Sequence, residues 1–539
     1  MNKIIKYDND ARQGIIKGID TVADIVKTTV GPRGRNVLIR EQLNTPTITN
    51  DGVSIAKAIQ LKDNIEDAGA SLIISAANKT NNIAGDGTTT TTILAQSIIH
   101  NFYKDCTDTV NPVQTQKEML QYSKVLSDYL KDNAKPVKDI TDIEKVATIS
   151  SGSEITGKLI AKAFELAGDY GSVIVEDSKT GLDEIQNIQG MKLTNGMVSA
   201  YLLNDRVNLK SVVTDANILV TTDKIDSASD LLPILDICLQ QNRKLLIICD
   251  DIEFEPLNMI IMNKAKGAPL NISIIRLPGF GQLREDLLED ICLATGATLM
   301  GRDNGITLKD FDISYLGEAD QIIVSMDDTI IKFKDVLSNG TDLLQNRQTR
   351  AEQLKTLMSK IEPTQQEQYK RRISNLLSGI SVLKIGGNSE VEIKDKKLRI
   401  EDALNSVQAA KEEGIISGGG YSFIQAYLDE QLKSHNFGEQ IILNSLLSVT
   451  YQIAQNSGFD GKQVVTKCIN EHKGFNALTA EFEDLLQSGV INSVKVDRYS
   501  LINAISVAST VITMGGLIVD ENEPESNVLQ LQAPMTSIM

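Results

Sequence analysis

The chain has 539 residues and a formal net charge of −17, because 71 aspartates and glutamates outnumber 54 lysines and arginines. Coating nucleic acid or an anionic membrane surface requires a basic face, so this charge argues against both kinds of partner. The composition, with 41% apolar and 23% charged residues, is typical of a soluble globular protein. At ~150 residues per domain, the length predicts about three or four structural units.

The cysteines and histidines are few and scattered. Five cysteines lie far apart, and the three histidines form no cluster with them. We therefore expect a reducing compartment and neither a disulfide framework nor a structural zinc site. The N-terminal segment has no apolar stretch of signal-peptide length, so a cytoplasmic protein is expected. The uncharged stretch 501–519 has too many polar residues and glycines for a membrane span and predicts a buried helix.

The first third of the chain has helical periodicity. Apolar residues follow the helical period from Ile15 to Val26, and Gly31-Pro32 ends this helix. A second helix is predicted over roughly 65–82, and a third begins within the threonine run that follows. We therefore expect the N-terminal part of the chain to be mostly helical.

Between about 190 and 335 the pattern changes to short β-rich runs that alternate with helical segments, which predicts an α/β unit. Two charged amphipathic helices separated by Pro363 follow, and helices continue from Glu401 to the end. Helical ends that flank an α/β middle predict that one domain is inserted into another. The expected strands are 218–221, 245–248, 272–275 and 322–325.

The strongest local signal is Gly85-Asp86-Gly87 followed by the threonine run 88–92 at the start of a helix. Backbone N–H groups and the positive end of the helix dipole bind phosphate at such a place, and glycines allow close approach. An acid beside a phosphate is repulsive unless a divalent cation lies between them, so Asp86 predicts a Mg²⁺ ligand. A glycine turn followed by a threonine-capped helix explains the same residues equally well without a ligand.

Two further loops near the N-terminus fit a phosphate site. Residues 29–35 form a helix end followed by a Gly/Pro turn with exposed amides, and 49–52 form a turn that presents a second carboxylate, Asp51. Each alone is an ordinary turn. Three such loops close together in the sequence favour a nucleotide pocket.

The segment 152–159 matches the spacing of a P-loop, GxxxxGK. It has Leu159 where that motif requires a Ser or Thr hydroxyl for Mg²⁺. We therefore interpret it as the start of a capped amphipathic helix.

Two helices of the α/β unit carry more apolar residues than one buried face needs. Such a surplus is either buried on both sides or exposed for a partner, and methionines suit a surface that adapts to varied apolar ligands. From composition alone, a doubly buried helix pair is the favoured interpretation. The residues are Leu231, Leu232, Ile234, Leu235, Ile237, Cys238 and Leu239 in the first helix and Leu257, Met259, Ile260, Ile261 and Met262 in the second.

Six motifs stand in the order found in group I chaperonins, and the chain closely resembles this family over residues 3–525. Any one motif is weak, but six in one order are very specific. The resemblance implies an ATP-hydrolysing molecular chaperone that acts in protein refolding and the stress response. The motifs are TVGP at 29–32, TNDGVS at 49–54, AGDGTTT at 84–90, LPGFG at 277–281, IEDAL at 400–404 and ISGGG at 416–420.

The resemblance implies a multidomain α/β fold, with a mostly helical equatorial ATPase domain, a small intermediate hinge domain and an α/β apical domain inserted in the middle of the chain. It also implies a homo-oligomer built as a heptameric ring, with two rings stacked. The ring would enclose unfolded or misfolded polypeptides under a GroES-type co-chaperonin and use ATP, Mg²⁺ and K⁺. The implied ranges are 1–132 and 413–539 for the equatorial domain, 133–189 and 380–412 for the intermediate domain, and 190–379 for the apical domain.

The resemblance also assigns roles to single residues. Asp402 would arrive on domain closure and position the attacking water, so that hydrolysis waits for a conformational step, and Asp51 would assist. Asp86 would ligate Mg²⁺, and Gly190 and Gly379 would form the apical hinge. The exposed-surface interpretation of the apolar helices is now preferred. The phosphates would be held by Thr29, Val30, Gly31, Pro32, Gly87, Thr88, Thr89 and Thr90, the nucleoside by Gly419, Asn476, Ala477 and Asn492, and the substrate and then the co-chaperonin by Tyr201, Leu232, Leu235, Leu257, Ile261 and Met262.

Some positions depart from the family pattern. Asn50 stands where the family has a lysine beside the phosphates, Asn492 where it has a ribose-binding aspartate, and Ser378 where it has a hinge glycine. We therefore expect slow turnover or weak nucleotide binding. An alternative is a holdase of chaperonin fold whose ATP cycling is impaired by Asn50 and Asn492. A metabolic ATP-using enzyme is a third class, but no second set of convergent polar residues and no P-loop supports it.

Overall fold

The computed structural model describes residues 3–40, 46–107, 110–168, 171–178, 180–205, 209–277, 281–358, 363–377 and 379–520. The chain folds into two compact units. One contains both ends of the chain, Met1–Ala161 and Gly387–Met539, and the other is the continuous segment Lys162–Gly386. This confirms that one part of the chain is inserted into another. The finer division into three domains stays a prediction.

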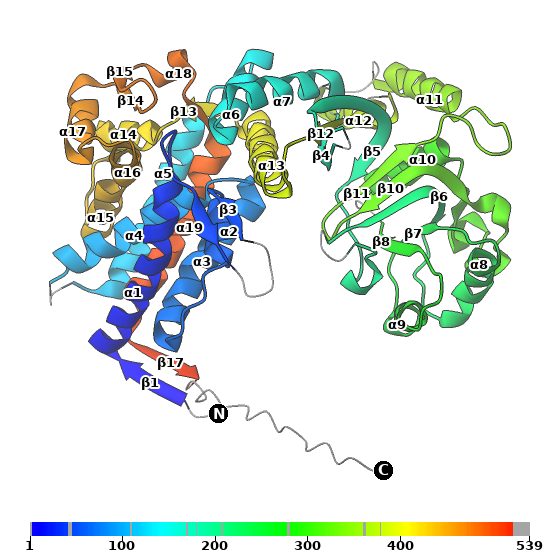
Figure 1. Cartoon of the computed structure of the whole chain (residues 1–539), viewed down its shortest axis with the longest axis horizontal. Coiled ribbons are helices and arrows are strands. Elements are labelled where there is room, and N and C mark those ends of the chain that lie inside the picture. The colour runs from blue at the N-terminus through cyan, green and yellow to red at the C-terminus, as the bar shows by residue number, and fades with distance from the viewer. Residues whose placement is uncertain are drawn as a thin grey trace, which may run out of the picture. The chain divides into compact units, whose positions relative to one another are not determined.

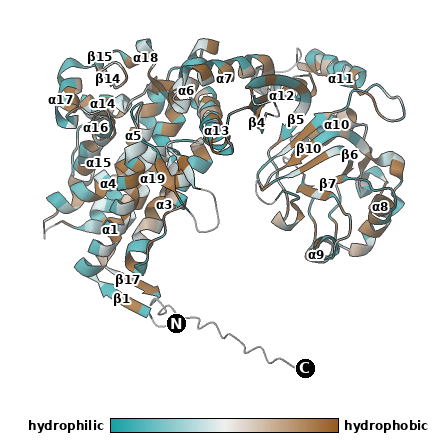
Figure 2. Ribbon diagram, viewed as in Figure 1, coloured by the Kyte–Doolittle hydropathy of each residue, from teal (hydrophilic) through white to brown (hydrophobic). Residues whose placement is uncertain are grey.

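The first unit is mostly helical, with α19 packed against α3, α4 and α5 (Figure 1). α19 is buried on nearly all sides and is largely brown in Figure 2, which confirms the predicted buried helix, although it ends at Ile512 and β17 follows it. Among the described residues, no helix is long and apolar enough to cross a membrane. The main helices are α1 (Asp8–Val26), α2 (Gly52–Lys57), α3 (Asn64–Ala84), α4 (Thr88–Asp105), α5 (Pro112–Asp132), α6 (Ile140–Ser151), α7 (Glu154–Ala167, which runs into the second unit), α13 (Glu390–Glu413), α14 (Tyr421–Leu428), α15 (Phe437–Leu446), α16 (Ser448–Asn456), α17 (Gly461–Glu471), α18 (Leu485–Ser488) and α19 (Val494–Ile512).

Short antiparallel strand pairs join the segments of this unit. The pair β1–β17 ties residues near the two ends of the chain together, and β13–β16 brings the segment after α13 beside the segment before α19. In the segment that resembles a P-loop, Gly152 ends α6 and α7 begins at Glu154. The Ser153 hydroxyl accepts from the N–H of Thr156 at 3.3 Å, so the interpretation as the start of a capped helix is confirmed. The strands are β1 (Lys3–Tyr7), β2 (Val37–Ile39), β3 (Thr47–Thr49), β13 (Ile415–Ser417), β14 (Gly474–Asn476), β15 (Glu481–Glu483), β16 (Ile491–Ser493) and β17 (Gly516–Asp520).

Helices α1 and α3 approach each other closely because both carry glycines at the crossing. A Cβ added to Gly18 would lie 1.8 Å from the backbone oxygen of Glu66, and one added to Gly69 would lie 2.1 Å from the oxygen of Ile15. No side-chain rotation relieves contacts with backbone. The crossing therefore admits only glycine at these two positions.

We expect Gly18→Ala to lower the thermal unfolding midpoint of the protein, because the two helices must move apart at a cost of roughly 1–3 kcal/mol. Gly515→Ala is the matched control, since nothing lies within 4 Å of a Cβ at that position. Calorimetry or circular dichroism compares the two variants with the parent. Equal midpoints for both variants would show that the crossing tolerates a methyl group.

The second unit is an α/β structure built on one sheet of the described residues, ordered β4-β12-β5-β11-β10-β6-β7-β8, with β9 beside β6. The strands β6, β7 and β8 are parallel, with α8 and α9 between them in the chain, while β5, β11, β10 and β6 run antiparallel in turn. All four expected strands are present. The elements are β4 (Val173–Asp177), β5 (Glu184–Leu193), β6 (Ser211–Thr221), α8 (Ala228–Gln240), β7 (Leu245–Cys249), α9 (Phe254–Ala265), β8 (Ile272–Arg276), α10 (Gly281–Thr295), β9 (Leu299–Met300), β10 (Gly317–Val324), β11 (Thr329–Phe333), α11 (Leu343–Met358), α12 (Pro363–Leu377) and β12 (Gly379–Ile385).

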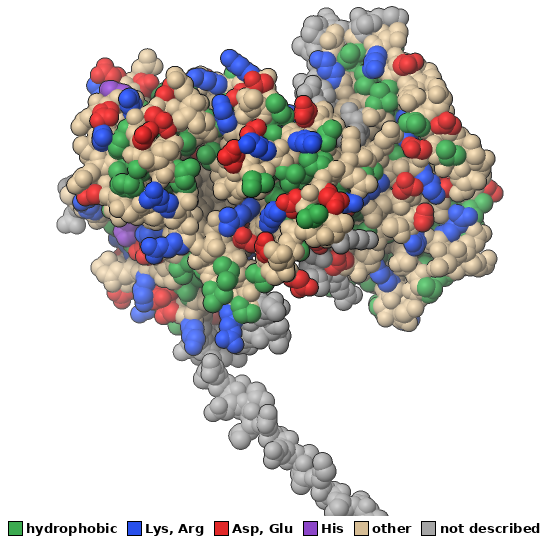
Figure 3. Space-filling model, turned by 45° about the horizontal axis from the view of Figure 1, so that its top comes forward, with side chains coloured by type: hydrophobic (Ala, Val, Ile, Leu, Met, Phe, Trp, Pro, Cys, Tyr) green, Lys and Arg blue, Asp and Glu red, His purple; other side chains and the backbone are tan. Residues whose placement is uncertain are grey.

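The surface carries both signs of charge. On the face drawn in Figure 3, acidic and basic side chains are interspersed and neither forms a continuous patch. The five cysteines are free, and all but Cys106 are buried. The expected absence of disulfide bonds therefore agrees with the five described cysteines.

Candidate functional site

The loop between α3 and α4 begins the site. Gly85 caps α3 with a left-handed φ of 74°, and Gly87 precedes α4 with a φ of 95°. Because the N-cap of α4 is a glycine, no N-cap side chain accepts from the first-turn N–H groups of this 18-residue helix. The Thr88 hydroxyl is buried and has no hydrogen-bond partner in the described structure. The threonine cap that would explain the motif without a ligand is therefore not formed, and a phosphate fits the free donors.

The two other predicted loops reach the start of α4. The hydroxyls of Thr29 and Thr89 lie 3.5 Å apart, and a Cβ on Gly52 would lie 2.7 Å from the Thr89 hydroxyl. The turn that contains Thr29 is held by Asn456, whose amide donates to two of its backbone carbonyls at 2.8 and 2.9 Å. Three loops that are separate in the sequence therefore meet at one helix N-terminus.

The turn that follows Thr29 is shaped by backbone geometry. Val30 is extended, Gly31 has a left-handed φ of 87°, and Pro32 fixes the next dihedral. The side chain of Ile453 lies 3.1 Å from the place where a Cβ of Gly31 would be. The turn therefore has no side chain at Gly31, where Ile453 packs against the backbone.

Asp86 is held by three hydrogen bonds. Its carboxylate accepts from the backbone N–H of Gly87 at 2.6 Å, from the hydroxyl of Ser150 on α6 at 3.0 Å and from that of Ser406 on α13 at 2.9 Å. Helix α13 also packs directly on the loop, since a Cβ on Gly85 would lie 2.1 Å from the Cβ of Asn405. Serines are common on helix surfaces, so the sequence offered no signal for Ser150 or Ser406.

Asp402 lies one helical turn before Ser406 on α13 and so shares its face. Burial, followed by the neighbouring charges of Asp86 and Asp51, raises the pKa of Asp402 to about 9. Burial also raises the pKa of Asp86, although its three hydrogen bonds favour the charged form. A nearby positive charge would lower these pKa values, and none among the described residues compensates the acids here. A divalent cation at Asp86 would supply it.

A Mg²⁺ ion at this place would take few ligands from the protein. Within the described ranges, no group of three or more His, Cys, Asp or Glu side chains is arranged to hold a metal ion. Asp51 accepts from the N–H groups of Val53 at 3.0 Å and Ser54 at 2.9 Å and thereby caps α2. Mg²⁺ is typically bound by one or two carboxylates together with phosphate oxygens. The residues therefore fit an ion that arrives with a nucleotide, with Asp86 as its protein ligand.

The residues expected around the nucleoside come together at a pair of small sheets. Gly419 has a left-handed φ of 62°, and a Cβ there would lie 3.7 Å from the backbone oxygen of Phe475. The next residues, Asn476 and Ala477, are buried. The Asn476 side chain donates to Glu483 at 2.7 Å and accepts from the backbone at 3.1 Å, so it shapes its own turn.

Asn492 lies on β16, beside this group. Its amide nitrogen donates to the carboxylate of Asp497, which also accepts from the Ser422 hydroxyl at 2.7 Å. Burial raises the pKa of Asp497 to about 7, against the effect of these two hydrogen bonds. The sequence analysis did not single out Asp497. Asp497 lies between Lys495 and Arg498 in the first turn of α19, where an acid is ordinary, so the sequence offered no specific signal for it.

The apolar residues predicted to face a partner lie on α8, α9 and the short turn Ala200–Leu202 of the second unit. Tyr201, Leu232 and Met262 are 69%, 49% and 48% exposed, whereas Leu257 and Ile261 are half-buried. Leu235 is only 5% exposed and belongs to the core, so the structure gives it a packing role. The helical period explains the difference, because Leu235 lies on the same face as the buried Leu231.

Two further exposed apolar residues were not among the six that the resemblance assigned to the substrate, although Leu239 belongs to the apolar surplus noted in the sequence. Phe254 begins α9 and is 78% exposed, and Leu239 near the end of α8 is also exposed. The expected apolar surface is therefore present with a different membership. Pro278, Gly279 and Phe280 of the fourth motif and the hinge position Ser378 lie outside the described residues.

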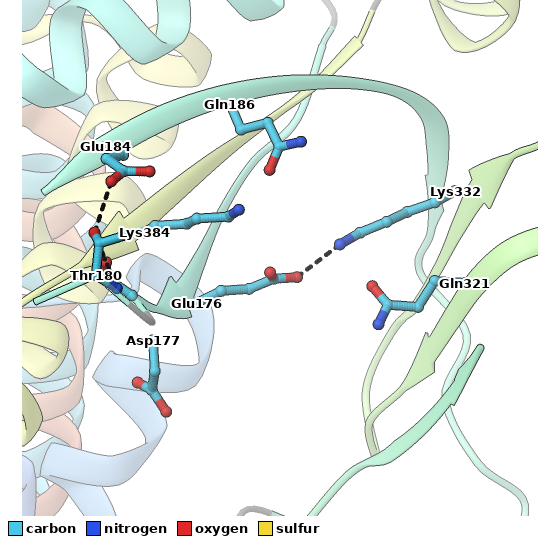
Figure 4. Close-up of a pocket in the computed structure, with 9 residues that line it drawn as sticks. Glu176, Asp177, Thr180, Glu184, Gln186, Gln321, Lys332 and Lys384 are labelled. Atoms are coloured by element: carbon cyan, nitrogen blue, oxygen red, sulfur yellow. Dashed lines mark hydrogen bonds and ion pairs between the residues drawn. The ribbon is translucent and has the colours of Figure 1, made fainter. Parts of the chain in front are cut away.

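A polar cavity of about 340 Å³ lies in the second unit and contains none of the predicted site residues (Figure 4). The Lys332 ammonium from β11 extends across it to Glu176 of β4 at 2.8 Å, and Thr180 donates to Glu184 at 2.6 Å. Lys332 is buried, so this ion pair compensates its charge inside the protein. We assign the cavity no ligand.

The comparison with protein families matches residues 22–522 to the TCP-1/cpn60 chaperonin family. A chaperonin GroEL from Acholeplasma laidlawii (strain PG-8A) is 38% identical over 537 residues, which cover 98% of this chain and 99% of the relative.

Solved structures agree with the fold. The chaperonin gp146 from bacteriophage EL 2 (Pseudomonas aeruginosa), crystallised in the presence of ATP-BeFx, matches 96% of this chain and 100% of that chain with a TM-score of 0.72 and 20% identity. A second crystal form of the same protein gives a TM-score of 0.63 at 19% identity and covers 96% of this chain and 99% of that chain. At these identities the match concerns the fold.

Proposed function

The chain belongs to the TCP-1/cpn60 chaperonin family, and on that premise we propose which residues carry its cycle of ATP hydrolysis and substrate capture. It is an ATP-dependent chaperonin and therefore an ATPase that acts in protein folding. The observation that carries the proposal is the meeting of three loops at the uncapped N-terminus of α4, beside the buried Asp86. A nucleotide phosphate with its divalent cation is the ligand whose charges suit both.

Thr29–Pro32 and Gly87–Thr90 would bind the phosphates through backbone N–H groups and hydroxyls. Asp86 would ligate Mg²⁺, which supplies charge neutralisation of the phosphates when it is bound. Gly419, Asn476, Ala477 and Asn492 would line the nucleoside, with Asn476 contributing through its backbone because its side chain is used in its own turn.

Asp402 would position and deprotonate the attacking water, with Asp51 assisting. Support comes from the shared face of Asp402 and Ser406 on α13, which directs Asp402 towards Asp86. The pKa of Asp402, raised to about 9 without a cation, falls as positive charge is added at Asp86. Asp402 would therefore be ionised, and able to act as a base, when the cation is bound at Asp86.

The exposed apolar residues of the second unit would bind non-native polypeptide and then a GroES-type co-chaperonin. Five of the six predicted residues would contribute, with Phe254 and Leu239 added and Leu235 supporting them from the core. The remaining parts of the proposal are a cytoplasmic homo-oligomer of heptameric rings, two rings stacked, the three-domain division given above and K⁺ as an accompanying ion.

Native mass spectrometry with and without Mg-ATP and a GroES-type protein tests this assembly. We expect a mass of seven or fourteen copies, increased by one or two co-chaperonin rings only when nucleotide is present. A monomer under all conditions would exclude the chamber. Capture of unfolded protein without release on ATP hydrolysis would favour the holdase alternative.

Asn50 allows a direct test of the missing positive charge. We expect Asn50→Lys to lower the KM for Mg-ATP about three- to tenfold, because a hydrogen bond to a charged group contributes roughly 1.5–3 kcal/mol, partly lost to solvent. Asn50→Gln is the control for side-chain length without charge. The KM values, measured at two salt concentrations, should fall with lysine alone and most at low salt. An unchanged KM would place Asn50 away from the phosphates.

A further inference from the structure

Asn492 lies at the edge of the loop that contains Gly419. It is paired with Ile416 in the two-stranded sheet β13–β16, and β13 leads into the glycines at 418–420. The backbone N–H of Gly418 also donates to the oxygen of Val490, the residue before β16, at 2.9 Å. Asn492 therefore lies on the strand paired with the one that leads into Gly419, which the proposed function assigns to the nucleoside.

The orientation of the Asn492 amide is set by Asp497. Asp497 is 3% exposed in the first turn of α19, and its carboxylate accepts from Asn492 Nδ2 and, through the other oxygen, from Ser422 Oγ at 2.7 Å. Both oxygens of Asp497 accept from side-chain donors in this arrangement, so Asp497 holds the nitrogen end of the Asn492 amide. The carbonyl oxygen of Asn492 then points away from Asp497. No described residue donates to it, and Asn492 is half-buried rather than enclosed.

Helix α19 links this pair to the phosphate end of the site. The hydroxyl of Ser500, one turn after Asp497, donates to the backbone oxygen of Gly87 at 3.1 Å. A Cβ on Gly87 would lie 2.9 Å from the side chain of Val496 on the same helix. One turn of α19 therefore contacts both the start of α4, through Ser500 and Val496, and the side chain of Asn492, through Asp497.

We propose that Asp497 is a positioning residue that fixes Asn492 so that its carbonyl oxygen accepts a hydrogen bond from a ribose hydroxyl of the bound nucleotide. An unrestrained amide presents either a donor or an acceptor, whereas an aspartate presents an acceptor alone. The buried carboxylate of Asp497 thus gives a neutral asparagine the acceptor role of an acid. This inference rests on the proposed nucleotide site and deepens it.

The test compares ATP with 2′,3′-dideoxy-ATP. Mg²⁺-dependent binding of both is measured by calorimetry on the parent, Asn492→Ala and Asp497→Asn. The parent should prefer ATP about three- to tenfold, the range of one neutral hydrogen bond. Both variants should lose this preference while their affinity for inorganic tripolyphosphate is unchanged, and the double variant should lose no more than either alone. A purely structural role for Asp497 would instead weaken all three ligands together and overturn the inference.

The exchange variant N492D/D497N keeps the test valid if a single variant folds poorly. It moves the carboxylate to position 492 and the amide to position 497 and leaves the two side chains able to hydrogen-bond. Recovery of the preference for ATP supports the inference. A parent that does not distinguish the two nucleotides, or an Asp497→Asn protein that retains the preference, overturns it while the nucleotide site stands. A parent that binds no Mg-ATP overturns both proposals.

Discussion

Asp402→Asn is expected to reduce the turnover of ATP by about 10²- to 10⁴-fold, the contribution of a well-placed general base. The affinity for Mg-ATP should be unchanged or higher, because the substitution removes an acid whose pKa is raised by burial and by the charges of Asp86 and Asp51. The amide has the size of the carboxylate and preserves packing on α13. Single-turnover hydrolysis and direct nucleotide binding together measure the two effects.

Glu401→Gln is the matched control, since it neutralises the adjacent, exposed residue on the same helix. Its turnover should remain within about twofold of the parent, as expected for a surface charge. If Asp402→Asn hydrolyses ATP at the parental rate, the base must be another residue. If it loses nucleotide binding instead, Asp402 has a structural role at the site.

A pair of acidic substitutions on the apolar surface, Leu232→Glu together with Met262→Glu, is expected to abolish the capture of unfolded protein. Each side chain is about half exposed, and burying an aliphatic side chain contributes roughly 1.5–3 kcal/mol when complete, so about tenfold weaker binding is expected for each residue. A charge that must be desolvated adds to the loss. Suppression of aggregation of a denatured protein measures the capture, and the rate of ATP hydrolysis should be retained.

Leu182→Glu provides the control, because Leu182 is an exposed leucine of the same unit on neither α8 nor α9. It should capture unfolded protein as the parent does. Equal loss in the control would mean that net charge rather than the apolar surface decides the result. Phe254→Ser extends the test, and a severalfold loss is expected because its ring is the most exposed of the group.

Much of the fold was predictable because local patterns and packing agree. The helical period before Gly31 and the β-rich runs of the second unit appear as expected, and the uncharged stretch after Leu501 is a buried helix as far as Ile512. The bounds were less exact: α13 begins at Glu390, eleven positions before the residue from which helices were expected. Its first turns carry charges on most sides, so no apolar stripe marks its start in the sequence.

The candidate site was predictable where chemistry is concentrated in a motif. Asp86 and the threonine run could be predicted from the properties of a helix N-terminus alone. Asp402 and Asn492 were predicted from the resemblance, because a single acid or amide on a helix or strand forms no recognisable sequence pattern. Ser150, Ser406 and Asn456 were missed for the same reason. They act through contacts with residues far away in the chain, which only the fold brings together.

The exposure of the apolar helices shows a different limit of prediction from the sequence. The surplus of apolar residues on α8 was visible in the sequence, but which of them face outward depends on how the helix is rotated against its sheet. Leu231 and Leu235 point into the core, and Leu232 and Leu239 remain exposed. The composition therefore indicated that an apolar surface exists, and the packing of the helix against the sheet determines which residues belong to it.

The most direct test of the account is recovery of activity from a chemically denatured enzyme that does not refold by itself. The protein is supplied with Mg-ATP and a GroES-type co-chaperonin, and recovery is compared with that in ADP and with that of Asp402→Asn. We predict that recovery requires ATP and the co-chaperonin and that it is absent in ADP and limited to a single round in the variant. Capture of the denatured enzyme without ATP-dependent recovery would contradict the account.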